Sequence, residues 1–312
     1  MEIINGFEKI PLLSKNPIIA IGNFDGIHLG HKKILECLAT EAKKNALLSL
    51  VLTFSPHPER ILGEKRIKMI QTLDQRVNEM KKFGIDTILI IPFDEKFSSL
   101  SSHDFVQKII VDRLKAKAVI IGENFRFGKN REGDIALLFR LAAGYNLKVH
   151  SIPPVTKEDM IVSSSLIRNF LKEGKIEQAN VLLGRFYEVA GKVIKGKSRG
   201  KTLGFPTANI KTENEIIPQG VFISTTGIGP ETFSSLTNVG KCPTFNQKET
   251  NIESYIMNLN RDIYGKKIRI NFLKRIRDEM KFKTQAELSQ QIKKDLELAK
   301  NYFRLRPIRG GH

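Results

Sequence analysis

Cysteine is scarce in this sequence: Cys37 and Cys242 are its only two, and they lie far apart without a metal-ligand spacing. This excludes a disulfide-stapled scaffold and a cysteine zinc site, and it predicts two thiols in a reducing cytoplasm. Long apolar runs are also missing, because the longest ones have the length of a strand. Residues 1–13 show no charged-then-apolar leader pattern. We therefore expect a cytoplasmic protein without a membrane-spanning segment.

Acidic residues are few relative to basic ones. The 312-residue chain has 33 aspartates and glutamates against 51 lysines and arginines, which gives a formal net charge of +18. Such a charge attracts polyanions, among them ATP and pyrophosphate as well as nucleic acids. The basic residues are spread along the chain, with one modest cluster near residues 192–201. We therefore expect anionic small-molecule substrates and no nucleic-acid partner.

Two kinds of pattern divide the chain, and its length also favours two domains. Up to residue 184, short apolar runs alternate with helical patterns, which predicts an α/β domain with a parallel sheet. Over residues 185–312, short β-rich runs are separated by glycines and turns, which predicts a small antiparallel β-barrel with a terminal helix. The first domain has expected strands at 18–23, 47–54, 87–91, 118–121 and 147–152 and expected helices at 31–44, 73–83, 103–114 and 133–143. The second has expected strands at 187–194, 220–227, 235–239, 252–259 and 267–273 and a helix that starts at Thr284.

The most informative stretch is residues 18–31, where an apolar strand runs into a glycine-rich turn and two histidines follow at the start of a helix. The glycines allow the backbone to approach a ligand closely, and free N–H groups at the helix start favour phosphates. His28 and His31 share one face of that helix, so both are expected to donate to the same phosphate charge. This predicts nucleotidyl transfer, and the alternative for either histidine is a capping or surface role. The expected ATP-binding residues of the turn are Gly22, Asn23, Phe24, Asp25 and Gly30.

Two further segments follow expected strands at the same edge of the sheet, where ligands of open α/β sheets bind. The first contains Phe54, His57 and Pro58, and the second contains Asn124 and Phe125. The alternatives are core positions for the phenylalanines and a rigid turn around His57. We expect both segments to line a ligand site.

A serine-rich helix start offers a second anion site in the same domain. Ser163, Ser164 and Ser165 supply hydroxyl and N–H groups, and Arg168 follows one turn later. This combination suits a pyrophosphate leaving group. The alternative is an ordinary N-cap with one solvated arginine, but the histidine motif in the same domain favours the anion site.

The second domain carries a glycine- and lysine-rich segment at 191–209. It is expected to cradle phosphates, and Thr207 and Asn209 offer two hard oxygens that suit Mg²⁺. Glu253 lies in a β-patterned run and is a candidate general base, the alternative being an exposed strand carboxylate. The expected phosphate-binding residues of this domain are Gly191, Lys197, Gly200, Lys201 and Gly204.

Together these motifs resemble the bacterial bifunctional riboflavin kinase/FMN adenylyltransferases, often called FAD synthetases. The first domain matches through G-N-F-D-G-I-H-L-G-H, the Pro56-His57-Pro58 turn, G-E-N-F-R-F-G and S-S-S-L-I-R. The second matches through L-G-F-P-T-A-N and further motifs up to R-D-E-M-K-F at residues 277–282. The resemblance implies a Rossmann-like nucleotidyltransferase domain that makes FAD and pyrophosphate from FMN and ATP. It also implies a kinase barrel that phosphorylates riboflavin with ATP to FMN.

The resemblance also implies roles for single residues. Glu253 corresponds to the base of the kinase reaction, and Thr207 and Asn209 to its metal-binding pair. His28 and His31 correspond to residues that stabilise the α-phosphate region. Flavin contacts are implied for Phe54, His57, Pro58, Asn124, Phe125 and Arg277.

The chain departs from the usual family pattern at three positions, where Phe222 replaces a tyrosine, Tyr255 a histidine and Lys241 an arginine. These changes spare the expected catalytic residues. Two rival interpretations are another H-x-G-H adenylyl- or cytidylyltransferase, which has no need of the barrel, and a basic nucleic-acid-binding protein without turnover.

Overall fold

The computed structural model describes the whole chain apart from residues 11–13, 64–66, 197–203, 245–246 and 308–312. The chain forms two compact units, Met1–Ser164 and Ser165–His312. The first is an α/β unit with a parallel sheet and the second contains a closed antiparallel barrel and a terminal helix, so the predicted fold class is confirmed. The functional boundary expected at residue 184 stays a prediction. Between it and the division at Ser164 lie α7 (Ser164–Lys172) and α8 (Ile176–Leu183), of which α8 contacts two barrel strands.

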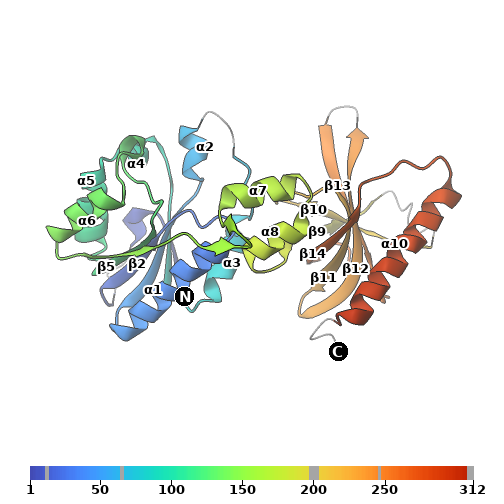
Figure 1. The fold of residues 1–312 in the computed structure, drawn as a ribbon, viewed down its shortest axis with the longest axis horizontal. Coiled ribbons are helices and arrows are strands. Elements are labelled where there is room, and N and C mark those ends of the chain that lie inside the picture. Colours follow the sequence, from blue (N-terminus) through green and yellow to red (C-terminus); the bar gives the residue numbers. More distant parts are fainter. Residues whose placement is uncertain (11–13, 64–66, 197–203, 245–246, 308–312) are drawn as a thin grey trace. The chain divides into compact units, whose positions relative to one another are not determined.

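Six parallel strands form the sheet of the first unit, in the order β1-β4-β3-β2-β5-β6 (Figure 1). From β2 the chain adds β3 and β4 on one side and then continues with β5 and β6 on the other side. The topological switch point therefore lies between β2 and β5, where open α/β sheets bind ligands. The strands are β1 (Glu2–Asn5), β2 (Pro17–Ile21), β3 (Leu48–Phe54), β4 (Thr87–Ile91), β5 (Ala118–Gly122) and β6 (Lys148–Ile152).

Helices cover both faces of this sheet. One face packs against α1 (Leu29–Lys44) and α3 (Leu73–Lys81), and the other against η2 (Phe105–Arg113) and α6 (Ile135–Ala143). The element η2 is a π-helix that continues the short α5 (Ser102–Asp104), where the sequence pattern predicts one α-helix. The remaining short elements are η1 (Phe7–Lys9), α2 (Pro58–Leu62), α4 (Glu95–Ser98), η3 (Lys129–Arg131), β7 (Thr156–Lys157) and β8 (Met160–Ile161).

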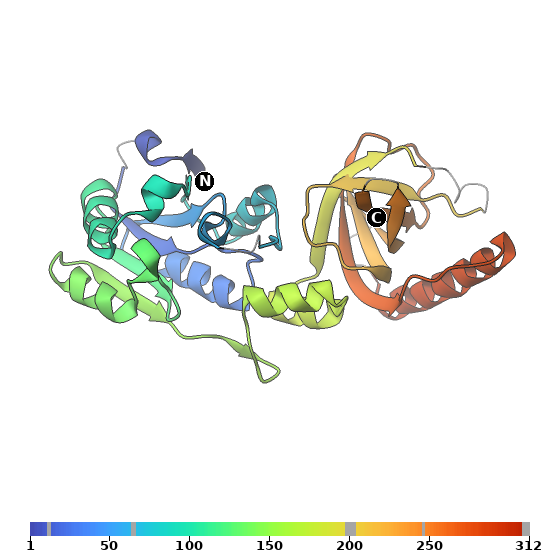
Figure 2. The ribbon, with the colours of Figure 1, turned by 90° about the horizontal axis from the view of Figure 1, so that it is seen from above.

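The second unit is built on a closed barrel of six antiparallel strands in the order β10-β13-β12-β11-β14-β9 (Figure 2). Five of them correspond to expected strands, and β10 begins at the end of the segment expected to cradle phosphates. The strands are β9 (Tyr187–Ile194), β10 (Ala208–Thr212), β11 (Gly220–Ile228), β12 (Glu231–Thr244), β13 (Gln247–Ile256) and β14 (Lys267–Arg277).

Helix α10 (Gln285–Leu305) lies along the outside of the barrel (Figure 2). Its N-cap is Thr284, whose side chain accepts a hydrogen bond from Glu287 N. The buried residues Leu296 and Ala299 pack against an apolar patch of β11 and β12 that includes Val221 and Leu236. The terminal helix expected to start at Thr284 is therefore confirmed.

None of the helices in the described ranges has both the length and the apolar character needed to cross a bilayer. Cys37, on α1, is a free thiol. Partial burial raises its pKa above the ordinary value, and the nearby Glu41 carboxylate adds to this effect.

Candidate active sites

The turn that follows β2 lies at the switch point and has an unusual backbone. Phe24, Gly26 and Ile27 have φ angles of 50°, 88° and 38°, all in the left-handed region. Phe24 and Ile27 are fully buried. A non-glycine residue in this region costs on the order of 1–3 kcal/mol, and it persists only where the surroundings hold it.

Two buried side chains, those of Asp25 and Arg76, hold this turn at its middle and at its beginning. The Asp25 carboxylate, 1% exposed, accepts hydrogen bonds from the N–H groups of Ile70 (3.1 Å to each oxygen) and Gln71 (3.3 Å). The Asn23 carbonyl accepts from Arg76 Nη1 at 2.6 Å and from Thr53 Oγ1 at 3.3 Å. Because amide groups engage the Asp25 carboxylate, this side chain shapes the turn. Its expected contact with ATP stays a prediction.

Arg76 brings a buried positive charge to the turn, since only 3% of this residue is exposed. Burial lowers the pKa of its guanidinium below the ordinary value. The Asp25 carboxylate opposes that shift, and the positive charge of Arg60 adds to it. The charge of Arg76 is therefore influenced by the Asp25 carboxylate and the Arg60 guanidinium.

The two histidines lie at the start of α1 with their rings stacked. Their ring centroids are 3.7 Å apart at an interplanar angle of 16°. His28 is the N-cap, and its Nδ1 accepts a hydrogen bond from His31 N at 3.3 Å. In the neutral ring the proton is therefore on Nε2, which makes Nε2 a donor. A Cβ on Gly30 would lie 3.2 Å from the His28 ring, so the tight approach favours glycine there.

Phe24 supports this pair and explains a further part of the motif. The edge of its ring packs against His31, with ring centroids 5.2 Å apart. A Cβ on Gly22 would lie 3.2 Å from the same phenylalanine ring. His28 therefore has the capping role that was considered as an alternative. The cap uses Nδ1, whereas the expected phosphate contact uses the N–H of Nε2.

The segment after β3 has structural roles in addition to the expected flavin contact. Phe54 is 8% exposed and belongs to the core, where its ring packs against Phe93 and Phe97. His57 is the N-cap of α2, and its Nδ1 accepts from Glu59 N at 3.2 Å. Pro58 is the first residue of that helix. Both alternatives considered for this segment, a core phenylalanine and a rigid turn, describe its local structure.

The segment after β5 is more open. Asn124 is exposed, and Phe125 is half-buried with its ring stacked on Phe127 at 5.5 Å. Phe127 belongs to the core. Phe125 is therefore held by a buried neighbour, while Asn124 is accessible to a ligand.

The serine-rich segment is tied to the turn through one hydroxyl. Helix α7 begins at Ser164, and Ser164 Oγ donates to the Asp25 carbonyl at 2.8 Å. Ser163 is half-buried and Ser165 is exposed. Arg168 is buried at 6% exposure, so the expected alternative of a solvated arginine is wrong.

In the second unit, three polar residues lie side by side on neighbouring strands. Glu253 of β13 is directly opposite Asn209 of β10 and Asn238 of β12. Directly opposite residues project to the same face of a sheet. The adjacent Ile252 and Ser254 are buried in the barrel, which places the half-buried row of three on the outer face.

Neighbouring groups orient two members of this row. Asn251 Nδ2 donates to Glu253 Oε1 at 2.7 Å. The amide of Asn209 lies against Gly196, where a Cβ would come within 2.1 Å of Nδ2. Within the described part of the chain no three His, Cys, Asp or Glu residues form a metal site. The Mg²⁺ site expected at Thr207 and Asn209 stays a prediction.

The glycines and lysines expected to bind phosphate in this unit differ in their setting. Gly191 is buried inside β9, and Gly204 is in an exposed turn with a φ of 82°. Lys197, Gly200 and Lys201 lie outside the described residues. Their expected roles stay predictions.

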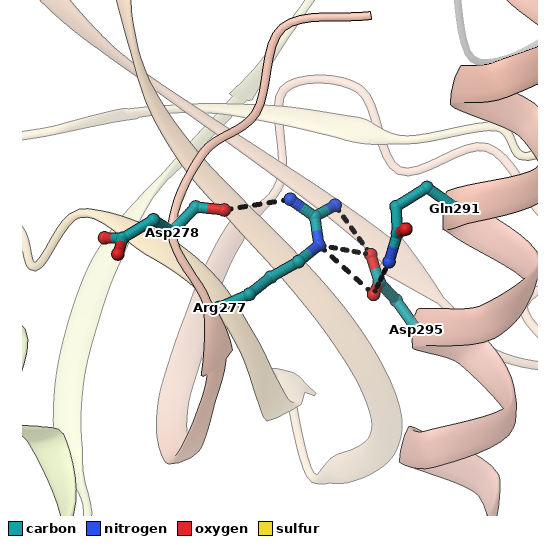
Figure 3. Close-up of polar contacts among 4 residues, drawn as sticks. All are labelled: Arg277, Asp278, Gln291 and Asp295. Atoms are coloured by element: carbon teal, nitrogen blue, oxygen red, sulfur yellow. Dashed lines mark hydrogen bonds and ion pairs between the residues drawn. The ribbon is translucent and has the colours of Figure 1, made fainter.

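Arg277, the expected flavin contact of this unit, is engaged by an acidic residue of α10 (Figure 3). Its Nη2 and Nε donate to Asp295 Oδ2 at 2.7 and 3.0 Å, and its Nη1 donates to the Asp278 carbonyl at 2.9 Å. Asp295 is 1% exposed and also accepts from Gln291 Nε2 at 2.9 Å. The Arg277–Asp295 pair thus fastens the end of β14 to the terminal helix.

Three residues of these sites did not emerge from the sequence as candidates: Arg76, Asn238 and Asp295. Arg76 and Asp295 look like ordinary charges on helix surfaces until the fold shows their burial. Asn238 lies in the expected strand 235–239, and only the pairing of β12 with β13 shows that it is next to Glu253.

Comparisons with known proteins identify a family for each part of the chain. A family model described as FAD synthetase matches residues 11–166, and one described as riboflavin kinase matches residues 183–303. A crystal structure described as that of a macrolide-efflux protein from Streptococcus pneumoniae has the same fold, with a TM-score of 0.89 and 29% identity. It covers 96% of this chain and 99% of its own.

Curated relatives align over nearly the full length of the chain, and each is named bifunctional riboflavin kinase/FMN adenylyltransferase. The protein from Buchnera aphidicola subsp. Schizaphis graminum is 38% identical over 98% of this chain and 100% of its own. The Bacillus subtilis protein is 36% identical over 92% of each chain, and the Escherichia coli K12 protein is 31% identical over 98% and 99%. The chain therefore belongs to the bifunctional riboflavin kinase/FMN adenylyltransferase family.

Proposed function

We propose that this chain phosphorylates riboflavin with ATP to FMN and then adenylylates FMN with a second ATP to FAD and pyrophosphate. The observation that carries the proposal is that the two family models match in order and that each falls on a different fold type. Each part holds its own constellation of polar residues. The two reactions therefore take place at separate sites.

In the adenylyl transfer, a phosphate oxygen of FMN attacks the α-phosphorus of ATP. The new oxygen–phosphorus bond forms as the bond to the β-phosphate breaks, and pyrophosphate leaves. The nucleophile is already an anion, so no covalent enzyme intermediate is needed and catalysis consists of alignment and charge stabilisation. His28 Nε2 and the His31 ring donate to the α-phosphate region. Ser163, Ser164, Ser165 and Arg168 bind the departing pyrophosphate.

In the kinase reaction, the terminal ribityl hydroxyl of riboflavin attacks the γ-phosphorus of MgATP. Glu253 accepts the hydroxyl proton as the bond from the γ-phosphorus to ADP breaks. Asn251 supports this role, because its hydrogen bond holds one carboxylate oxygen and leaves the other for the substrate. Thr207 and Asn209 hold the Mg²⁺ that accompanies the ATP, and the metal neutralises phosphate charge there.

The expected location and surface charge of the enzyme are compatible with these substrates. We infer a cytoplasmic enzyme whose basic surface attracts ATP and FMN, with no nucleic-acid partner. Strong RNA binding that falls steeply with salt, in the absence of ATP consumption, would instead support the nucleic-acid-binding alternative.

One assay tests the proposal. The purified chain is incubated with riboflavin and MgATP, and the flavins are separated by chromatography. We expect FMN to appear first and FAD to follow with release of pyrophosphate. A preparation that makes neither flavin contradicts the proposal, and one that makes FMN alone contradicts its second half.

A further inference from the structure

The structure points to a positioning residue for the adenylyl transfer that lies outside the histidine motif. We propose that Arg76 of α3 fixes the peptide plane between Asn23 and Phe24 and thereby aims the Phe24 N–H at the phosphates of ATP. The inference rests on the proposed function of the first unit. It assigns to Arg76 no contact with the reacting atoms.

The first step of the argument is the geometry of a peptide bond. In a planar trans peptide the C=O and the following N–H point in opposite directions. Arg76 Nη1 holds the Asn23 carbonyl at 2.6 Å, and Thr53 Oγ1 holds it at 3.3 Å. The N–H of Phe24 therefore points away from α3. This side of the peptide is the one left for an anion.

The second step is that the turn needs such a hold. Phe24 and Ile27 adopt left-handed φ angles that side chains disfavour, so the turn relaxes to another conformation once its restraints are removed. The Asp25 carboxylate fixes the middle of the turn through the N–H groups of Ile70 and Gln71. Arg76 is the matching restraint at its beginning.

The third step is that Arg76 is itself held rigidly. Thr72 and Gln75 form a reciprocal capping box at the start of α3, and Arg76 N donates to the Thr72 carbonyl at 3.0 Å. The segment that restrains Asp25, residues 70–71, directly precedes this cap. One short stretch of chain, residues 70–76, therefore holds both the beginning and the middle of the phosphate-binding turn.

The charge of Arg76 has a second use. Its guanidinium holds the Asn23 carbonyl, so its positive charge lies directly behind the peptide that would face the ATP phosphates. It strengthens the attraction of that turn for negative charge that develops during the transfer.

The test compares Arg76→Met and Arg76→Lys in the full-length chain, with FMN adenylylation and riboflavin phosphorylation measured on the same preparation. For Arg76→Met we expect kcat of adenylylation to fall on the order of 10²-fold, with a much smaller change in KM for ATP. The kinase activity stays at the wild-type value. Arg113→Met is the matched control, because Arg113 also donates to a backbone carbonyl of this unit, that of Phe7, but on the surface.

Arg76→Lys separates positioning from a loss of folding. A lysine there keeps a charge and an N–H donor. Burial lowers the pKa of a lysine enough for it to lose its proton in the working pH range, whereas an arginine stays protonated. We expect adenylylation by this variant to fall at alkaline pH where the wild type and the kinase activity of the same variant do not. Unchanged kcat in both variants would overturn the inference. So would losses that match the fraction of unfolded protein in thermal melting curves.

The wild-type chain measured alongside keeps the two hypotheses apart. Wild-type protein that makes FMN but no FAD contradicts the proposed function of the first unit. Wild-type protein that makes FAD, together with Arg76 variants that retain its kcat and pH profile, contradicts only the role of Arg76.

Discussion

The two candidate sites are built in different ways. The first is a turn whose strained backbone is held by single contacts with distant parts of the unit, namely residues 70–71, Arg76 and Ser164. The second is a row across three paired strands, in which the ladder places Asn209 opposite Glu253 and Glu253 opposite Asn238. A turn of the first kind depends on each restraint separately. The position of a row of the second kind is fixed by all the backbone hydrogen bonds between the barrel strands together.

The two largest effects are expected on the two activities, and the first of them comes from His28→Ala. We expect kcat for FAD formation to fall by about 10²–10³-fold, because a donor to the developing phosphate charge is lost, while FMN still accumulates. Chromatography of the flavins measures both. His28→Asn is the matched variant, since an asparagine keeps the N-cap acceptor of α1 but not the imidazole. Loss of both activities in a folded variant would contradict separate sites.

Glu253→Gln sharpens the comparison from the other side. Without the carboxylate, we expect riboflavin phosphorylation to fall by about 10²–10⁴-fold, while FMN supplied from outside is still converted to FAD. Glu231→Gln is the control, because Glu231 pairs with Arg261 at a different position of the barrel. If the Glu253 variant phosphorylates riboflavin at the normal rate, this glutamate is not the base.

The sequence predicts those parts of the fold that depend on contiguous residues and misses those that depend on distant partners. Local patterns suffice for the central strands and for the motif turn, because their glycines, histidines and apolar runs are contiguous. The edge strand β1 did not emerge, since its four residues give no clear pattern. Strand β10 did not emerge either, because a barrel partner on each side makes an extended strand of residues whose glycine- and lysine-rich surroundings resemble a loop.

The two charged site residues, Arg76 and Asp295, were missed for the same physical reason. Arg76 meets the Asn23 carbonyl across 53 positions of sequence, and Arg277 meets Asp295 across 18. A charged residue on a helix is usually solvated, and no local pattern distinguishes one that tertiary packing buries. Such pairs become visible only when the fold is known.

Asp295→Ala tests whether the barrel site depends on a single contact after all. Removal of the carboxylate leaves the Arg277 guanidinium without its main partner in a mostly buried position, which costs about 3–5 kcal/mol of unfolding free energy. We expect the second unit to melt earlier and adenylylation of FMN by the first unit to persist. The double variant Arg277→Met/Asp295→Leu should recover much of the loss, because it removes both charges together. Equal melting of the single variant and the wild type would show that the pair contributes nothing.

The smallest effect is expected inside the barrel, where five hydroxyl groups form a continuous hydrogen-bonded cluster. Ser224 Oγ lies 2.8 Å from Ser235 Oγ and 2.7 Å from Thr237 Oγ1, and all three residues are fully buried. Ser224→Ala leaves two hydroxyls with one partner fewer, which costs about 1–3 kcal/mol. The exposed Ser99→Ala, whose Oγ bonds only to the Lys96 carbonyl, should change the unfolding free energy by less than about 0.5 kcal/mol.

The kinase kinetics of Ser224→Ala show whether the hydroxyl cluster positions Glu253. Because strand pairing as a whole holds the row of Glu253, we expect kcat and KM of the kinase in Ser224→Ala to equal those of the wild type below its melting temperature. A drop in kcat in the folded variant would show that one interior hydroxyl positions Glu253. The barrel site would then depend on single restraints in the same way as the turn that Arg76 and Asp25 hold.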